Sequence, residues 1–238
     1  MLTKNELRCW DDGGDPLPIT GLPAKPTQLV GGFEFACVLL GNGQVFCRGS
    51  NLRGQLGILE GASEEERTKS RIHKYARFTR VKALGDDTRL IAAGPDHSCA
   101  LKRNGSVWCW GENDAGQVGK GDISTCKPDG AKHFLLSSCM PEQGLEPSLV
   151  DGLPADIQEL ELGARTSCAI DRGGTVWCWG YIDEPTPKPL ALDVGARVAT
   201  ITLGEDFCAL LRDGRVLCRG QQPYTYWSRA RSMPLGCR

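Results

Sequence analysis

The stretch His97–Gly119, "HSCALKRNGSVWCWGENDAGQVG", places two cysteines ten positions apart on either side of a glycine. In residues 99–102, Cys99 and Leu101 alternate with Ala100 and Lys102, and in residues 107–110, Val107 and Cys109 alternate with two tryptophans. Alternation of this kind is the period of a β-strand. The intervening "RNG" ends in Gly105, and a three-residue hairpin loop needs a left-handed conformation at its last position. The stretch therefore predicts a β-hairpin.

The register of this hairpin explains the cysteines. Pairing the strands across the turn places Ala100 opposite Trp108 and Cys99 opposite Cys109. Directly opposite Cα atoms lie about 4.5–5.5 Å apart, within the range of a disulfide. Free thiols in the core are an alternative, and metal ligation is a more distant one. Zinc sites usually use cysteine pairs two to four residues apart, and the histidines are scattered at positions 73, 97 and 133.

Similar segments occur four times in the chain, which makes internal repetition the main organising feature. The four hairpins read "CVLLGNGQVFCRG" (37–49), "CALKRNGSVWCWG" (99–111), "CAIDRGGTVWCWG" (168–180) and "CALLRDGRVLCRG" (208–220). Each follows a twelve-residue segment that aligns without gaps, at 21–32, 83–94, 152–163 and 193–204. Agreement over so many positions predicts four copies of one structural unit.

The twelve cysteines divide into pairs under this interpretation. The four hairpins predict the bonds Cys37–Cys47, Cys99–Cys109, Cys168–Cys178 and Cys208–Cys218. Cys126 and Cys139 lie in one insertion and are expected to close a loop there. "ELRCWDD" (6–12) matches the outgoing half of a hairpin and "PLGCR" the incoming half, which predicts a terminal hairpin joined by Cys9–Cys237.

Units of short strands must pack on one another to bury an apolar face. The shortest separation between first cysteines is 40 residues, from 168 to 208, which is typical of a β-propeller blade. We therefore expect an all-β chain with one propeller domain over residues 1–238 and insertions at about 58–82 and 120–148. Four complete blades and one split between the termini would make five. An open arc, continued in a longer chain or completed by a second molecule, is the alternative.

"IAAGPDHSCALKRNGSVWCWGENDAGQVG" closely resembles the repeat of the regulator-of-chromosome-condensation family of β-propellers. "GENDAGQVG" and "GSNLRGQLG" (49–57) resemble that family's Gly-x-Asn-x-x-Gly-Gln-Leu-Gly signature. The cysteine- and tryptophan-rich form resembles versions in secreted or surface proteins of bacteria. The resemblance covers most of residues 6–220, and it implies a fold more than a function. Known members have seven blades, and the tails after 180 and 220 lack the signature.

The signature residues are expected to have structural roles within a blade. The glycines after each second cysteine should allow a tight exit from the hairpin: Gly49, Gly111, Gly180 and Gly220. Asn51 and Asn113 should satisfy loop backbone, while Gln55 and Gln117 should bond between neighbouring blades. The position of His97 is occupied by different residues in the other copies, such as Phe35 and Thr166. This variety favours a structural role for His97 over a catalytic one. The tryptophans at 108, 110, 177 and 179 favour packing between blades over a platform for sugars.

The overall charge excludes a general attraction to nucleic acid or anionic membranes, because the formal net charge is −1. The chain has no apolar run of the length that a membrane helix needs and no secretory signal at its start. Systematic disulfides imply an oxidising compartment, so we expect a secreted, periplasmic or cell-surface location. Glycine and proline are abundant, at 30 and 14 residues, which favours short strands and turns.

No catalytic motif is found: the sequence has no Gly-x-Ser-x-Gly elbow, His-Glu-x-x-His pattern or phosphate-binding glycine loop. We therefore predict a non-enzyme with no cofactor and no metal. Binding is expected where the repeat is interrupted. The first insertion contains a basic segment, 67–82, without acidic residues, and its candidate partner-binding residues are Arg67, Lys69, Arg71, Lys74, Tyr75, Arg77, Phe78 and Arg80.

Several functions fit these observations. The leading hypothesis is a protein-interaction module that binds an acidic partner through rim loops and the two insertions. A solvated basic loop held down by Ile72 and Phe78 is an equally weighted alternative for the segment, and nucleic acid binding is disfavoured. The family resemblance also implies nucleotide exchange on a small GTPase, and a carbohydrate-binding or enzyme-inhibiting propeller is a third hypothesis.

Overall fold

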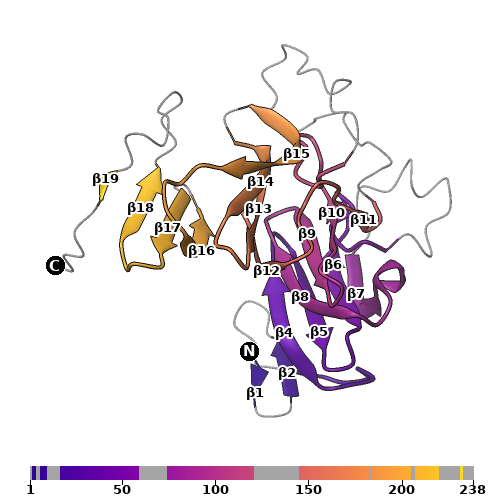
Figure 1. Ribbon diagram of the computed structural model, residues 1–238. Helices are drawn as coiled ribbons and strands as arrows, with labels where there is room; N and C mark the ends of the chain where they lie inside the picture. The colour runs from indigo at the N-terminus through magenta and orange to yellow at the C-terminus, as the bar shows by residue number, and fades with distance from the viewer. Residues whose placement is uncertain are drawn as a thin grey trace.

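The computed structural model describes residues 2–3, 6–9, 17–58, 74–120, 145–182, 184–204, 207–219 and 231–232. The described strands form five antiparallel sheets, one of three strands and four of four strands. Figure 1 shows these sheets in chain order, from indigo at the N-terminus to yellow at the C-terminus. The prediction of an all-β fold is confirmed.

The second four-stranded sheet contains the hairpin described above. It consists of β8 (Thr88–Ala93), β9 (His97–Lys102), β10 (Val107–Gly111) and β11 (Ser148–Leu149). The register pairs Cys99 with Cys109 and Ala100 with Trp108, as predicted. Gly105 has a φ of 87°, the left-handed conformation that ends the three-residue loop.

The other three sheets repeat this arrangement, and we number the four sheets as blades in chain order. The first blade contains β4 (Pro26–Gly31), β5 (Phe35–Leu40), β6 (Val45–Ser50) and β7 (Lys74–Arg80). The third contains β12 (Ile157–Leu162), β13 (Thr166–Asp171), β14 (Val176–Tyr181) and β15 (Pro185–Leu192). The fourth contains β16 (Val198–Leu203), β17 (Phe207–Leu211), β18 (Val216–Arg219) and β19 (Arg231–Ser232).

Each of the four hairpins contains the disulfide that its sequence predicts. The bonds are Cys37–Cys47, Cys99–Cys109, Cys168–Cys178 and Cys208–Cys218. Their Cα atoms lie 4.0–4.1 Å apart, somewhat closer than the about 4.5 Å of the nearer kind of directly opposite pair. Cys126, Cys139 and Cys237 lie outside the described residues, so the bonds Cys126–Cys139 and Cys9–Cys237 stay predictions.

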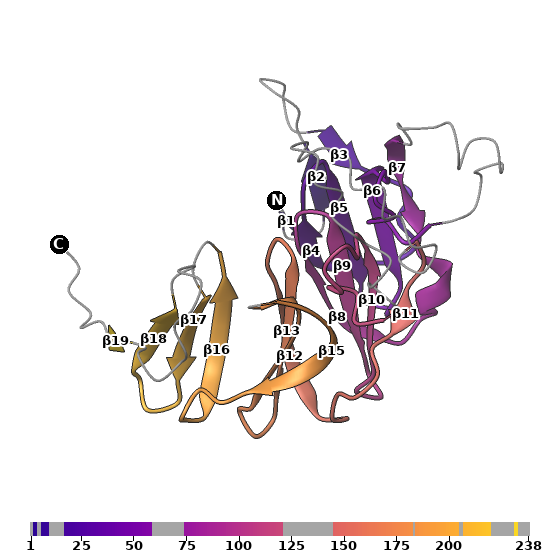
Figure 2. The same ribbon diagram turned by 90° about the horizontal axis from the view of Figure 1, so that it is seen from above.

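The blades pack face to face, and the first strands β4, β8, β12 and β16 lie next to one another in that order. Figure 2 shows the sheets standing side by side. The disulfide of each of the first three blades faces the next blade. For example, Cys99 and Cys109 share a core cluster with Leu160, Ala169 and Trp179 of the third blade. This apolar packing between neighbouring sheets is how a repeat of short strands obtains a core.

The fourth blade leaves its equivalent face open. Leu210 is 39% exposed, whereas the residues at the same position in the other blades, Leu39, Leu101 and Ile170, are 0–5% exposed. Cys208 and Cys218 are likewise half-buried, whereas the other three disulfides are fully buried. Within the described residues, the blades therefore form an arc that ends at a partly exposed apolar face of the fourth blade.

The predicted hairpin shared between the termini is not tested, because its incoming half "PLGCR" (234–238) lies outside the described residues. β1 (Leu2–Thr3), β2 (Glu6–Cys9) and β3 (Leu17–Ile19) form a sheet on their own. In this sheet β1 pairs with β2 through Leu2 opposite Leu7 and Thr3 opposite Glu6, which the sequence did not predict. Residues 231–232, just before that half, form β19 and pair with β18 as the outermost strand of the fourth blade. The count of five propeller blades stays a prediction.

The only described helix is the 3-10 turn η1 (Lys82–Leu84) that leads into the second blade. Within the described parts of the chain, no helix is long and apolar enough to cross a membrane.

Candidate functional site

The basic segment predicted as a partner-binding site is described only from residue 74 onward. Arg67, Lys69 and Arg71 lie outside the described residues. Lys74 to Arg80 form β7, the outermost strand of the first blade. The outermost strand of a sheet presents its free edge to other molecules. The structure therefore places Lys74, Tyr75, Arg77, Phe78 and Arg80 on one strand at the rim.

The side chains of β7 divide between packing and exposure. Arg77 is exposed, whereas Phe78 is half-buried and packs on the cluster around Val38 and Leu40. The guanidinium of Arg48 lies 5.8 Å from the centre of the Phe78 ring, within the range of a cation–π contact. Arg80 forms an ion pair with Asp86.

Arg48 was not predicted from the sequence, and it adds a positive charge beside this strand. The pairing of Cys47 with Thr79 in neighbouring strands brings it there, and the spacing of the insertion does not reveal that register. Phe78 packs the strand onto the core of the first blade, as the alternative of a solvated basic loop expected. Arg77 is exposed to solvent. The residues of the second insertion from 121 to 144 lie outside the described residues.

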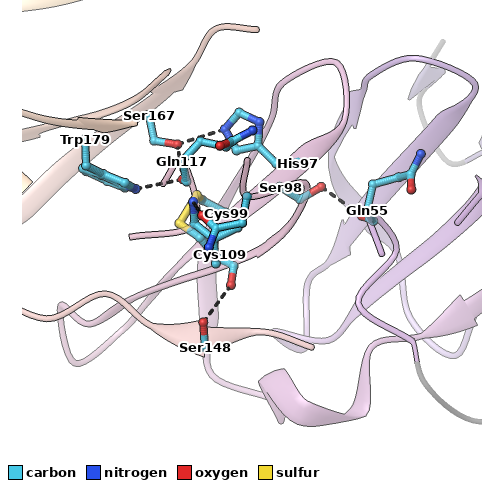
Figure 3. The surroundings of a disulfide bond; sticks show 11 residues. Gln55, His97, Ser98, Cys99, Cys109, Gln117, Ser148, Ser167 and Trp179 are labelled. Carbon is cyan, nitrogen blue, oxygen red and sulfur yellow. Dashed lines mark hydrogen bonds between the residues drawn. A yellow bond between two sulfur atoms is a disulfide. The ribbon is translucent and has the colours of Figure 1, made fainter. Parts of the chain in front are cut away.

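Neighbouring blades are joined by a hydrogen-bonded contact that we call the glutamine latch. The backbone carbonyl of Gln117, in the tail after the second blade's hairpin, accepts two hydrogen bonds from the third blade. The donors are Trp179 Nε1 at 2.9 Å and Ser167 Oγ at 2.8 Å, as Figure 3 shows. Trp179 is fully buried, so the bond lies in the core, where an unpaired polar group would be costly.

The same latch joins the first and second blades. The carbonyl of Gln55 accepts from Trp110 Nε1 at 2.9 Å and from Ser98 Oγ at 3.2 Å. The prediction that Gln55 and Gln117 bond between blades is confirmed, although the backbone oxygen makes the contact. The amide oxygen of each glutamine instead accepts from a backbone N–H of its own loop.

The predicted loop role of the signature asparagines is also confirmed. The side chain of Asn51 bonds the backbone of Leu56 and Ile58. Asn113 bonds Val118 and Lys120 in the same way. Each tail is therefore held in shape by its own asparagine before it meets the next blade.

His97 has a structural place between the second and third blades. Its Nε2 lies 2.9 Å from Ser167 Oγ, and that hydroxyl donates its proton to Gln117. Ser167 must therefore accept from Nε2–H, which leaves Nδ1 without a proton in the neutral ring. Nδ1 is buried and has no hydrogen-bond partner among the described residues. Burial lowers the pKa of His97 from 6.5 to about 3.

His97 should make stability fall as the pH falls below 6.5, because the unfolded chain takes up a proton that the folded chain refuses. The loss is up to about 1.4 kcal/mol per pH unit between the unfolded and folded pKa values. We expect His97→Thr, which copies Thr166 of the next repeat, to lack this part of the pH dependence. Urea unfolding at pH 7, 5.5 and 4.5 measures the difference. Equal slopes for wild type and variant would contradict a neutral His97.

Charged side chains reinforce the contacts between these loops. Arg53 of the first blade pairs with Glu112 of the second at 3.3 Å, and Asp114 of the second pairs with Arg165 of the third at 2.7 Å. Burial raises the pKa of Glu112, and the neighbouring Asp114 raises it further, while Arg53 opposes both. In each pair a basic side chain of one blade meets an acidic side chain of the neighbouring blade, so these ion pairs join loops of adjacent blades.

The described part of the chain offers no group of three or more histidine, cysteine or acidic side chains that could hold a metal ion. All eight cysteines of the four described hairpins are oxidised to disulfides. The disulfides indicate an oxidising environment for the folded chain.

Comparison with known sequences agrees with the repeat. Two profiles described as "Regulator of chromosome condensation (RCC1) repeat" match residues 27–55 and 89–117, and 104–170. The human E3 ubiquitin-protein ligase HERC2 is 25% identical over 260 residues, covering 88% of this chain and 5% of that protein. The human X-linked retinitis pigmentosa GTPase regulator is 30% identical over 160 residues, covering 67% of this chain and 13% of that protein.

Solved structures show the same fold. Human WBSCR16 superposes with a TM-score of 0.67 at 16% identity, covering 88% of this chain and 51% of that one. Prp20p from Saccharomyces cerevisiae gives a TM-score of 0.65 at 20% identity, covering 91% and 50%. These structures show that the chain has a β-propeller fold. The matching repeat profiles and the relative that is 30% identical over 67% of this chain show that it belongs to the family built from regulator-of-chromosome-condensation repeats. It spans about half the length of these two structures.

Proposed function

We propose that the protein is a non-catalytic interaction module that binds an acidic protein partner along the rim of its first blade. The observation that carries this proposal is β7, an outermost strand with basic side chains. Arg77 is exposed there, and Arg48 lies beside it over Phe78. The glutamine latches support the proposal because binding residues act best on a rigid scaffold.

The relatives support an interaction or regulatory role. One is named a GTPase regulator, and yeast RCC1 (Prp20) has been solved bound to Kap60. The oxidised hairpins support a secreted or surface location, where a partner would meet the rim directly. In this proposal the two insertions, at about 58–82 and 120–148, extend the binding surface beyond β7.

Reversal of the Arg77 charge tests the rim. Arg77→Glu should reduce recovery of the partner in a pull-down by about tenfold at physiological salt, because a repulsive rim charge slows association and weakens binding. Lys188→Glu is the matched control, since Lys188 is exposed on β15, the outermost strand of the third blade. Unchanged recovery with Arg77→Glu and with a deletion of residues 60–80 would exclude this rim as the binding surface. Loss of recovery after nuclease treatment would assign the strand to nucleic acid instead.

Regulation of a small GTPase is the second candidate function, favoured by the relative that is named a GTPase regulator. Such a role inside the cell would expose the disulfides to reduction. Thiol titration of the natively expressed protein without reductant separates the two candidates. Nearly no free thiols support the rim-binding module outside the cytosol, and about twelve free thiols support the intracellular regulator.

A further inference from the structure

A cavity of about 270 Å³ lies between the second and third blades, at the end of the blades that carries the hairpin turns. We call this end the turn face. Figure 1 shows β12 beside β8 where the two blades meet. The polar side chains that line the cavity belong to Arg89, Arg103, Asn104, Asp156, Gln158 and Arg172. This cavity is separate from β7, and its proposed use does not depend on the proposed function.

The repeat brings the arginines together. Arg103 and Arg172 are the first turn residues of two consecutive hairpins. The backbone N–H of each donates to the backbone carbonyl of the residue just before the first strand of its blade. The acceptors are Asp87 for Arg103, at 2.9 Å, and Asp156 for Arg172, at 3.0 Å. Equivalent turns of adjacent blades therefore bring both arginines to the lining of the same cavity.

The third arginine crosses the boundary between the blades. Arg89, at the start of β8, donates from Nη2 to the carbonyl of Ile157 in β12 at 2.7 Å. Its remaining N–H groups are left for other acceptors, because a guanidinium has five. Beside the cavity, Gly105 (φ 87°) comes so close to the third blade that a Cβ there would lie 1.8 Å from the Ala155 carbonyl oxygen. The walls of the cavity are therefore held together by backbone contact as well as by Arg89.

Positive charge predominates in the cavity, with three arginines against the carboxylate of Asp156. The nearby Asp87 is paired with Lys102 at 3.1 Å, and Asp86 with Arg80. In the described part of the chain, the guanidinium groups of Arg103 and Arg172 form no ion pair. The adjacent Arg212 adds positive charge, since its Nη2 donates to the carbonyl of Arg172 at 2.7 Å.

We propose that this cavity binds a phosphate monoester, carried by a protein side chain or by a small molecule. Two unbalanced positive charges match a phosphate dianion better than a single carboxylate. The planar fork of arginine binds phosphate oxygens in pairs, which a lysine cannot do. The cavity volume of about 270 Å³ lies just below the range of about 300–1,000 Å³ usual for ligand sites, which suits a small group such as a phosphate monoester.

Calorimetric titration at fixed ionic strength tests the proposal with phosphoserine, a neutral peptide containing one phosphoserine, inorganic phosphate and a glutamate-containing peptide. We expect the phosphorylated probes to bind wild type, and the double variant Arg103→Gln/Arg172→Gln to lose at least about tenfold in affinity. Arg215→Gln is the matched control, because Arg215 is exposed on the same face, pairs with Asp213 and does not line the cavity. This control should bind as wild type does.

The probes also distinguish the source of the phosphate. Tighter binding of the phosphopeptide than of phosphoserine would indicate a protein ligand, and equal binding a small molecule. The proposal is overturned if no phosphorylated probe binds at 10 mM (roughly the weakest affinity of interest), if the glutamate peptide binds as tightly, or if the double variant binds like wild type. A circular dichroism melt of the double variant checks that it is folded.

Discussion

Replacement of Trp179 with alanine should lower the free energy of unfolding by about 3–5 kcal/mol, the range measured for buried tryptophan and phenylalanine truncations. Trp179 is fully buried in the cluster between the second and third blades. The substitution leaves a cavity there and removes one of the two donors to the Gln117 carbonyl. Urea unfolding followed by far-UV circular dichroism measures the loss.

Two further variants separate packing from hydrogen bonding. Trp179→Phe keeps most of the ring but not the indole N–H, and should cost about 1–3 kcal/mol. Trp177→Ala is the control, because Trp177 packs at the edge of the same cluster and is half-buried, but its indole N–H bonds Asp171 within its own blade instead of the Gln117 carbonyl. Its expected cost is about 1–2 kcal/mol. An equal loss of unfolding free energy for Trp177→Ala and Trp179→Ala would show that the glutamine latch adds no stability beyond that of an ordinary tryptophan contact.

Removal of a buried hairpin disulfide is the second large effect. The double variant Cys168→Ala/Cys178→Ala should lose about 3 kcal/mol, because the bond restricts the unfolded chain. The two sulfurs also belong to the core cluster between the third and fourth blades, so packing is lost as well. The same unfolding experiment, run on the purified double variant without reductant, measures this loss.

Exposure should set the order in which the four bonds are reduced. Cys208–Cys218 is half-buried, and the other three bonds are fully buried. Mild phosphine reduction followed by alkylation and peptide mass spectrometry should therefore label Cys208 and Cys218 first, since attack on a disulfide sulfur depends on access. Simultaneous labelling of all eight hairpin cysteines would contradict local reduction and indicate that global unfolding comes first.

Much of each blade could be predicted from the sequence because the hairpin is a local structure. Two cysteines ten positions apart around a three-residue turn fix the register, and every described hairpin follows it. The asparagines of the tails could be placed for the same reason, since they bond residues only a few positions away.

The residues of the glutamine latch also follow a pattern in the sequence that could have predicted it. A serine before the first cysteine and a tryptophan after the second occur together in the two repeats that follow a Gly-Gln tail. These are Ser98 with Trp110 and Ser167 with Trp179. The first and fourth hairpins follow other tails and have Ala36 with Arg48, and Phe207 with Arg219.

Other features depend on how blades meet, which spacing alone does not reveal. The cavity of the turn face takes arginines from a strand and two turns of different blades. The contact of Arg48 with Phe78 depends on the register of β7 after an insertion. The pairing of β1 with β2 joins two very short strands that lie outside the four repeats. In the first two cases the deciding contact is non-local.

The latch also defines where this protein could be divided and recombined. Each latch joins a tail to the hairpin of the following blade, so a cut between two sheets separates the accepting carbonyl from its donors. A cut directly after Gly111 or Gly180 keeps Gln55 with Trp110, or Gln117 with Trp179, on one exchangeable segment. The natural module for building longer or shorter propellers from this chain is therefore offset from the visible sheet, running from one glycine exit to the next.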